Sequence, residues 1–378
     1  MGVRTTAAVT ATAALLGAGA VAVAAGRYAG DFALRSGNPP LPAGFTGPPV
    51  TVHGVTRDEI ALTRSLATVR PGIYGLTGPG CHAVVGSPVE EGPRQADTVV
   101  RRLERVTRGE LRAGAQLWLT PQLYAGDPLG ALGLDYSDVE IGGELGSLPA
   151  WFVPGARDTW VIALHGLGAG REHPLNVLPY LHRLRFPVLV PGHRADPASV
   201  RRGGAGPGFE ERAWHDADAA LRCALRYGAR QVVLYGWSAG GAMALRTALR
   251  SPLRGSVAGV VADSPVLDWP VTVEALAAHR GVPRPLRPLA VRAVLGQDRL
   301  GPDPAVPPPG GAGTLPPTLI LHGPDDTVAP WRTSRELAAR HPEHVVLHPV
   351  GRAQHAAMWN ADPQSCEEAL RRFLTPLM

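Results

Sequence analysis

Short apolar runs recur along the chain after about residue 150. Each is rich in Val, Leu or Ile and is bounded by Gly, Pro or charged residues. The runs are residues 159–166, 186–192, 231–236, 257–265, 317–323 and 344–350. Continuous apolar runs of this length are typical of strands that are buried on both faces. The pattern therefore predicts a sheet made mostly of parallel strands.

Segments with helical periodicity lie between these runs. One face of a predicted helix carries the apolar residues Trp214, Ala217, Leu221 and Ala224. Gly228 would end this helix, because glycine readily adopts the left-handed conformation found just beyond helix ends. Near the carboxyl terminus, Asp362 can cap and Pro363 can begin a further helix. Alternating strands and helices predict an α/β fold with a doubly wound sheet covered on both faces.

The alternation is interrupted between about residues 267 and 317, where no strand is predicted. This stretch ends in a Gly- and Pro-rich sequence and is expected to be a cap inserted over the sheet. Four of its basic residues are Arg280, Arg284, Arg287 and Arg292. We expect them to face water; contact with an anionic head group of a substrate is the alternative.

The amino-terminal segment carries no charge from Thr5 to Gly26, and "AVA" at residues 22–24 resembles a signal-peptidase site. Residues 1–36 are therefore expected to be a signal peptide or membrane anchor that places the protein in the cell envelope and associates it with the membrane. An alanine-rich helix of a cytoplasmic protein is the alternative. Residues 37–49 form a predicted Pro- and Gly-rich linker.

Residues 50–150 show short apolar runs broken by Gly and Pro, which predict a small strand-rich region. One helix is expected within it, at about residues 96–114. Residues 151–378 would then form the catalytic domain.

Composition excludes several classes of function. Net charge is only +5, all 37 basic residues are arginine, and they are scattered, so no nucleic-acid partner is expected. Cys81, Cys223 and Cys366 are far apart and odd in number, which argues against a disulfide framework. Since no cluster has metal-ligand spacing, neither a metal nor another cofactor is predicted.

Ser238 lies in the sequence "LYGWSAGGAM", at residues 234–243. Glycine is frequent in this chain, so the pattern G-x-S-x-G alone is weak evidence. Here, however, an apolar strand precedes the serine and a helix follows it, which is the context of a nucleophile elbow. We therefore predict that Ser238 is a catalytic nucleophile, whereas Ser264 in "DSP" is expected to be a turn residue.

A serine nucleophile needs a base within hydrogen-bonding reach, and the base needs an orienting group. Asp326 follows the strand at 317–323, and His355 follows the strand at 344–350. Parallel strands end at one edge of the sheet, so Ser238, Asp326 and His355 can meet there. Asn360 is expected to pack near His355.

Other residues remain candidates for the acid and the base. Asp263 follows its own predicted strand, and Asp325 directly precedes Asp326. His322 and His165 are alternatives to His355, although histidines in such H-G turns are expected to hydrogen-bond with the backbone.

An anion-stabilising site is also required. "ALHGLGAG" follows the first strong strand, and the backbone N–H groups of Leu167 and Ala239 are the predicted oxyanion-hole donors.

These motifs resemble those of the α/β-hydrolase fold superfamily, in particular bacterial serine hydrolases of the esterase, lipase and acyl-peptidase kind. The matching sequences are "HGLG", "GWSAGG", "HGPDDTVAP" and "QHAAMWN", in that order. The likeness implies that Asp326 rather than Asp325 is the acid. Ala239 stands where many relatives carry Met or Gln, but only its N–H group is needed.

The prediction is a serine hydrolase that cleaves carboxylic esters of small molecules through an acyl-enzyme on Ser238. A serine peptidase or acyl-peptidase of the same fold is an alternative. It ranks lower because about 100 residues before the catalytic part are too few for the propeller that such peptidases generally carry. A non-catalytic surface protein that kept the fold is the third hypothesis.

Overall fold

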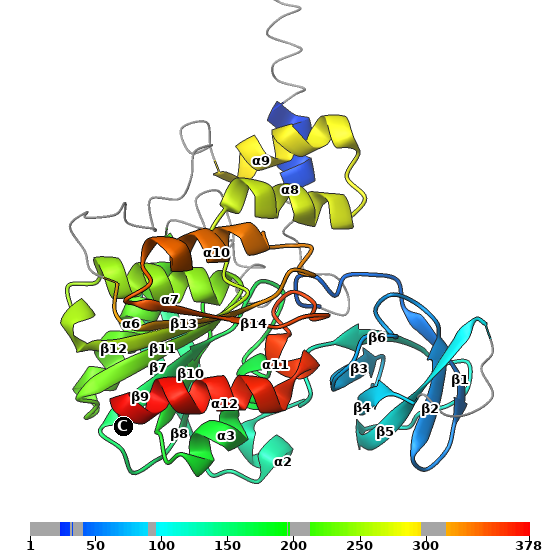
Figure 1. The fold of residues 1–378 in the computed structure, drawn as a ribbon, viewed down its shortest axis with the longest axis horizontal. Helices are drawn as coiled ribbons and strands as arrows, with labels where there is room; N and C mark the ends of the chain where they lie inside the picture. The colour runs from blue at the N-terminus through cyan, green and yellow to red at the C-terminus, as the bar shows by residue number, and fades with distance from the viewer. Residues whose placement is uncertain are drawn as a thin grey trace, which may run out of the picture.

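The computed structural model describes residues 23–30, 32, 41–89, 96–194, 196, 212–295 and 315–378. Its strands form an eight-stranded sheet and a closed six-stranded barrel, which lie side by side (Figure 1). Most of the predicted signal or anchor segment falls outside the described residues. Within the described residues, no helix is both long and apolar enough to cross a membrane.

The six apolar runs of the second half all form strands of the large sheet, as predicted. They are β9 (Thr159–Leu164), β10 (Val188–Pro191), β11 (Gln231–Trp237), β12 (Val257–Asp263), β13 (Thr318–His322) and β14 (Val345–Pro349). The strand order is β14-β13-β12-β11-β9-β10-β8-β7, and β14 through β10 are parallel. The carboxyl ends of these strands therefore lie along one edge.

Two further strands extend this sheet beyond β10. They are β7 (Ser137–Gly143) and β8 (Gly146–Val153), which pair with each other and, through β8, with β10 in antiparallel fashion. The large sheet therefore begins before residue 151, within the stretch that the sequence pattern places in the amino-terminal region.

Helices cover both faces of the sheet (Figure 1). One face carries α6 (Trp214–Arg226), α7 (Ala239–Arg250) and α10 (Trp331–Arg340); the other carries α3 (Leu178–Arg183) and α12 (Pro363–Leu374). The predicted helix ends are confirmed: Gly228 follows α6 with a φ of 112°, and the Asp362 side chain caps α12 by accepting from Ser365 N. Short helices α2 (Pro128–Leu132) and α11 (Met358–Ala361) contribute side chains to the core beneath α3 and α12.

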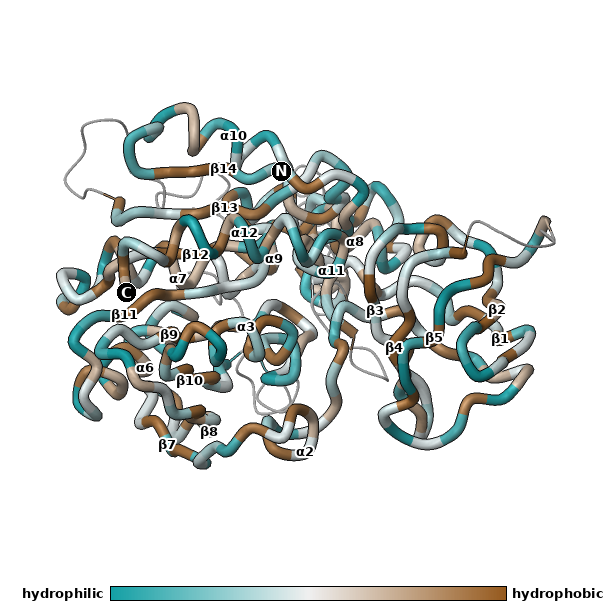
Figure 2. Tube along the Cα trace, turned by 60° about the horizontal axis from the view of Figure 1, so that its bottom comes forward, coloured by the Kyte–Doolittle hydropathy of each residue, from teal (hydrophilic) through white to brown (hydrophobic). Residues whose placement is uncertain are grey.

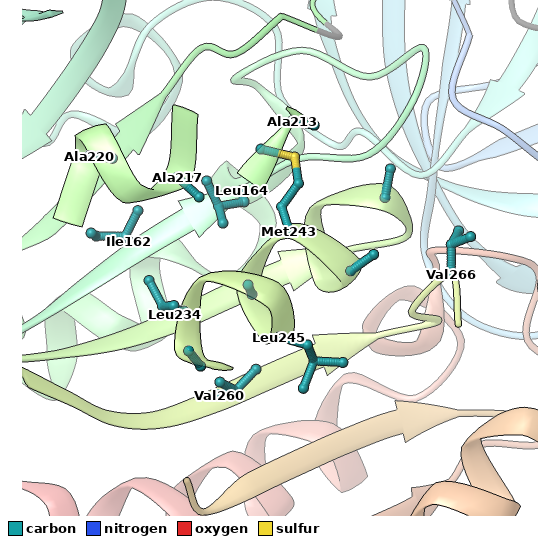
Figure 3. Close-up of a cluster of buried hydrophobic side chains, with 14 of the residues drawn as sticks. Ile162, Leu164, Ala213, Ala217, Ala220, Leu234, Met243, Leu245, Val260 and Val266 are labelled. Atoms are coloured by element: carbon teal, nitrogen blue, oxygen red, sulfur yellow. The ribbon is translucent and has the colours of Figure 1, made fainter. Parts of the chain in front are cut away.

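Alternate residues of each central strand enter separate cores on the two faces. On β11, Val232 and Leu234 join the core beneath α6 and α7, which Figure 3 shows around Leu164 and Met243. Val233 joins the core beneath α3 and α12. Burial on both faces explains why the strand sequence is continuously apolar.

The expected cap contains α8 (Trp269–His279) and α9 (Arg287–Leu295), which lie above the sheet (Figure 1). Much of its Gly- and Pro-rich end lies outside the described residues. A helix at residues 23–30 packs against the cap, where Ala29 shares a buried cluster with Ala277 and Ala290.

The amino-terminal strands close into an antiparallel barrel in the order β1-β2-β5-β4-β3-β6, visible at one end of the molecule in Figure 2. These strands are β1 (Val50–Val55), β2 (Glu59–Thr63), β3 (Tyr74–Gly78), β4 (Cys81–Pro88), β5 (Thr98–Arg108) and β6 (Gln116–Thr120).

The prediction of a helix at about residues 96–114 is wrong. This segment contains β5, which pairs with both β2 and β4. β-branched residues such as Val99 and Val100 favour a strand. The pattern places Arg101 on a solvent-facing side, but this arginine is fully buried and donates to the carbonyl oxygens of Thr68 and Gly72.

Candidate active site

Ser238 occupies the turn between β11 and α7, in a backbone conformation with φ 54° and ψ −118°. Such a left-handed φ is unusual for a residue other than glycine, and strain of this kind concentrates at functional sites. The two flanking glycines permit the sharp turn. A Cβ at Gly236 would lie 2.2 Å from the carbonyl oxygen of Gly240, and one at Gly240 would lie 2.1 Å from that of Leu164.

The three residues predicted to form a triad lie within hydrogen-bonding distance in series. Ser238 Oγ is 2.7 Å from His355 Nε2, and His355 Nδ1 is 2.8 Å from Asp326 Oδ2. They come from the segments after β11, β14 and β13, at the carboxyl edge of the sheet. An ionised carboxylate only accepts hydrogen bonds, so Nδ1 donates to Asp326 and Nε2 is left to accept from the serine.

Asp326 is surrounded by donors although it is buried. Its Oδ1 accepts from Val328 N at 2.8 Å and Ala329 N at 2.9 Å, and its Oδ2 also lies 3.1 Å from His322 Nε2. Burial alone would raise the pKa of Asp326. Electrostatic interaction with His355 and the hydrogen bonds from His322 and His355 outweigh burial and hold the pKa of Asp326 well below its usual range. The carboxylate is therefore ionised at neutral pH.

His322 is a site residue whose part the sequence did not reveal. Its Nδ1 lies 2.7 Å from Ser334 Oγ on α10, while its Nε2 contacts Asp326. We expected it to hydrogen-bond with the backbone. Its spacing of four residues from Asp326, across a turn, is the one sequence signal from which a contact could have been predicted.

The alternative candidates make other contacts. Asp325 Oδ2 accepts from Arg352 N at 2.7 Å, on the surface. Asp263 Oδ1 is 3.0 Å from Ser264 Oγ, and Ser264 Oγ in turn accepts from Ala356 N at 2.9 Å. Asp326 is thus the carboxylate that hydrogen-bonds with His355, and Ser264 supports the loop beside this histidine.

The loop after β9 places Leu167 close to Ser238. A Cβ at Gly166 would lie 2.8 Å from Ser238 Cβ, so only glycine permits this approach. Ala239 is the first residue of α7, directly after Ser238. Both proposed oxyanion donors therefore belong to segments adjoining the serine.

His193 and Asp196, which the sequence does not predict as site residues, contact His165 at the start of the loop after β9. His193 Nε2 donates to the carbonyl oxygen of His165 at 2.9 Å, and His165 Nε2 lies 2.8 Å from Asp196 Oδ1. The two imidazole rings stack with their centroids 3.9 Å apart. No local sequence pattern joins His165 to residues about thirty positions away, so sequence reasoning missed this support.

Asn360 follows His355 by five residues, but it contacts the barrel. Its Nδ2 donates to the carbonyl oxygens of Ile73 at 2.9 Å and Pro121 at 2.8 Å, and Ile73 N donates to Asn360 O at 2.9 Å. The segment that carries the imidazole is thereby fixed to the barrel.

Comparison with known proteins agrees with this architecture. Residues 51–120 match a domain of unknown function (DUF8805), and residues 159–306 match the alpha/beta hydrolase fold family. No curated protein matches the chain. A crystal structure of an esterase from Pyrococcus furiosus superposes with a TM-score of 0.54 and 21% identity, over 67% of this chain and 95% of the esterase.

Two other crystal forms of that esterase give TM-scores of 0.52 and 0.51 at 20% identity, over 67% of this chain and 94% and 96% of theirs. Identity at this level supports a shared fold. The chain is therefore a protein of the alpha/beta hydrolase fold, and the structures it resembles are those of esterases.

Proposed function

We propose that the protein hydrolyses carboxylic esters by transferring the acyl group first to Ser238 and then to water. The observation that carries the proposal is the pair of hydrogen bonds that joins Ser238 Oγ, His355 and Asp326 at 2.7 Å and 2.8 Å. A nucleophile, its base and an orienting carboxylate in this order are the working parts of serine acyl transfer.

In the first half-reaction, Ser238 Oγ bonds to the carbonyl carbon while its proton passes to His355 Nε2. The carbonyl π electrons move to oxygen, where the N–H groups of Leu167 and Ala239 stabilise the anion. The tetrahedral intermediate then expels the alcohol, which takes the proton from His355. Asp326 stabilises the imidazolium that exists between these steps.

In the second half-reaction, water attacks the acyl carbon and gives a proton to the same Nε2. The ester bond to Ser238 breaks, the serine oxygen regains its proton from His355, and the carboxylic acid leaves. The serine hydroxyl and the neutral imidazole are thus restored, and no other reactant is consumed.

Replacement of the nucleophile tests the proposal. Ser238→Ala should lower kcat for p-nitrophenyl esters by about 10⁶-fold, because the triad acts as a unit. Thermal unfolding should show that the variant is folded. An alanine variant that turns over these esters like the wild type would refute the assignment of Ser238.

A parallel assay with aminoacyl-naphthylamides measures amide cleavage by the same purified protein. The proposal expects kcat/KM to be higher for the esters, whereas a higher value for the amides would favour a peptidase.

A further inference from the structure

Residues 41–45, with the sequence LPAGF, cross between the two loops that carry the proposed catalytic groups. We call these residues the strap. All five are buried, although the sequence pattern places them in an extended linker. A buried linker must have its backbone polar groups paired, so its contacts reveal what it supports.

At one end, the strap contacts the loop after β9, which carries the proposed oxyanion donor Leu167 and which we call the oxyanion loop. Ala43 N donates to the carbonyl oxygen of Leu167 at 3.0 Å. A Cβ at Gly168 would lie 2.3 Å from the carbonyl oxygen of Leu41, so the two backbones touch without an intervening side chain. The residue whose N–H is the proposed oxyanion donor is therefore fixed by the strap.

At the other end, the strap contacts the base. Gln354 Nε2 donates to the carbonyl oxygen of Gly44, and Gln354 directly precedes His355. Gly44 has a φ of 86°, and a Cβ there would lie 2.9 Å from the Cβ of His355. Glycine is thus required at position 44 both for its backbone conformation and for the close approach.

The barrel anchors the strap. Phe45 is buried in the barrel core, and its ring centroid lies 6.2 Å from that of Tyr74. The strap is therefore held at its barrel end while its other residues contact Leu167 and His355.

We propose that the strap is a positioning element that sets the oxyanion donor of Leu167 relative to the base, His355. This inference rests on the proposed function, because it assigns both groups to one reaction. The reacting carbonyl has to reach Ser238, Leu167 N–H and His355 Nε2 together. Misplacement of a reacting group by about 1 Å can cost about 10²-fold in rate.

Gly44→Ala in the full chain is the main test. The added methyl should push His355 from Ser238, so kcat for a p-nitrophenyl ester should fall by about 10²-fold while KM changes little. The rate at which a fluorophosphonate labels Ser238 should fall in parallel.

Gly114→Ala is the matched control. Gly114 also has a φ of 86°, but a Cβ there would have no atom within 4 Å. Both variants therefore place a non-glycine residue at the same φ, so a loss of Tm that is common to both reports backbone strain, and any further loss in Gly44→Ala reports the contact with His355. Only Gly44→Ala should lose kcat.

Gln354→Met tests the role of the strap if Gly44→Ala does not fold. It removes the donor to Gly44 with little change in size. We expect kcat to fall several-fold and Tm to fall by only a few degrees, because one buried carbonyl loses its donor. Wild-type kcat and labelling rates in the folded variants would overturn the role of the strap. A wild-type protein that neither hydrolyses esters nor labels at Ser238 would instead overturn the proposed function, and the strap's role with it.

Discussion

Two buried aspartates lie near the proposed base, and their surroundings give them opposite properties. Asp326 accepts hydrogen bonds from two backbone N–H groups and contacts two imidazoles, which keep it ionised. Asp263 is fully buried with Ser264 beside it, and burial raises its pKa to about 7. Position along the sequence does not distinguish them, because each follows a strand of the same sheet. The two carboxyl groups differ instead in the number of hydrogen-bond donors that surround them.

Asp263→Asn should change how stability depends on pH. Between about pH 4 and 7 the unfolded Asp263 is ionised while the folded one keeps its proton, so wild-type stability contributed by this group is present below pH 4 and is lost as pH rises toward 7. Asparagine does not ionise, so the variant does not lose stability in this way as pH rises. The free energy of unfolding of the variant, minus that of the wild type, should therefore rise over this range, by up to about 4 kcal/mol.

Denaturant titrations of both proteins at several pH values between 4 and 7.5 measure this difference. The comparison cancels the contributions of other groups, such as His173, whose pKa burial lowers to about 3. A difference that stays constant with pH would show that Asp263 is ionised in the folded protein.

At the scale of the elements, the sequence predicts best where local pattern and tertiary environment agree. β9 to β14 are continuous apolar runs because both faces of the sheet are covered, and the three residues proposed as a triad lie just beyond the ends of three of those runs. The sequence of β5 resembles that of a helix because its arginines mimic a helix's polar face. Half of a barrel strand faces solvent, so charge is compatible with either structure.

The contacts missed from the sequence join distant segments. Gln354 and Gly44 are 310 residues apart, and Asn360 lies 239 residues from Pro121. His165 and His193 are likewise brought together by neighbouring strands. No local periodicity encodes such pairs, and they appear only once the fold is known.

The helix at residues 23–30 packs on α9 through small residues. A Cβ at Gly26 would lie 2.8 Å from the carbonyl oxygen of Leu289, and one at Gly30 would lie 3.0 Å from Val294 Cγ2. Gly26→Val should therefore force the helix away from α9, because a backbone atom cannot yield as a flexible side chain does.

Hydrogen exchange of peptides covering α9 measures this effect, and we expect faster exchange in Gly26→Val. Tyr28→Val is the control, because this substitution introduces the same β-branched residue into the same helix at a position that is 74% exposed. Equal protection of α9 in Gly26→Val and the wild type would contradict the packing.

At the scale of the whole molecule, the barrel is attached where the proposed chemistry takes place. Asn360 ties the segment after His355 to Ile73 and Pro121, and the strap leads from the oxyanion loop into β1. Asn176 adds a third connection by donating to the carbonyl oxygen of Pro121 at 2.8 Å. The barrel thus supports the segment around His355 from two directions, which gives the matched domain of unknown function a structural part in this chain.

The central claim is that Ser238 is a nucleophile activated by His355, and covalent labelling tests it most directly. The purified full chain is incubated with a fluorophosphonate, its intact mass is measured, and the adduct is located by peptide mapping. The account predicts one adduct per chain, on Ser238, with labelling much slower in His355→Ala. An unlabelled chain, or an adduct on any other residue, would contradict it.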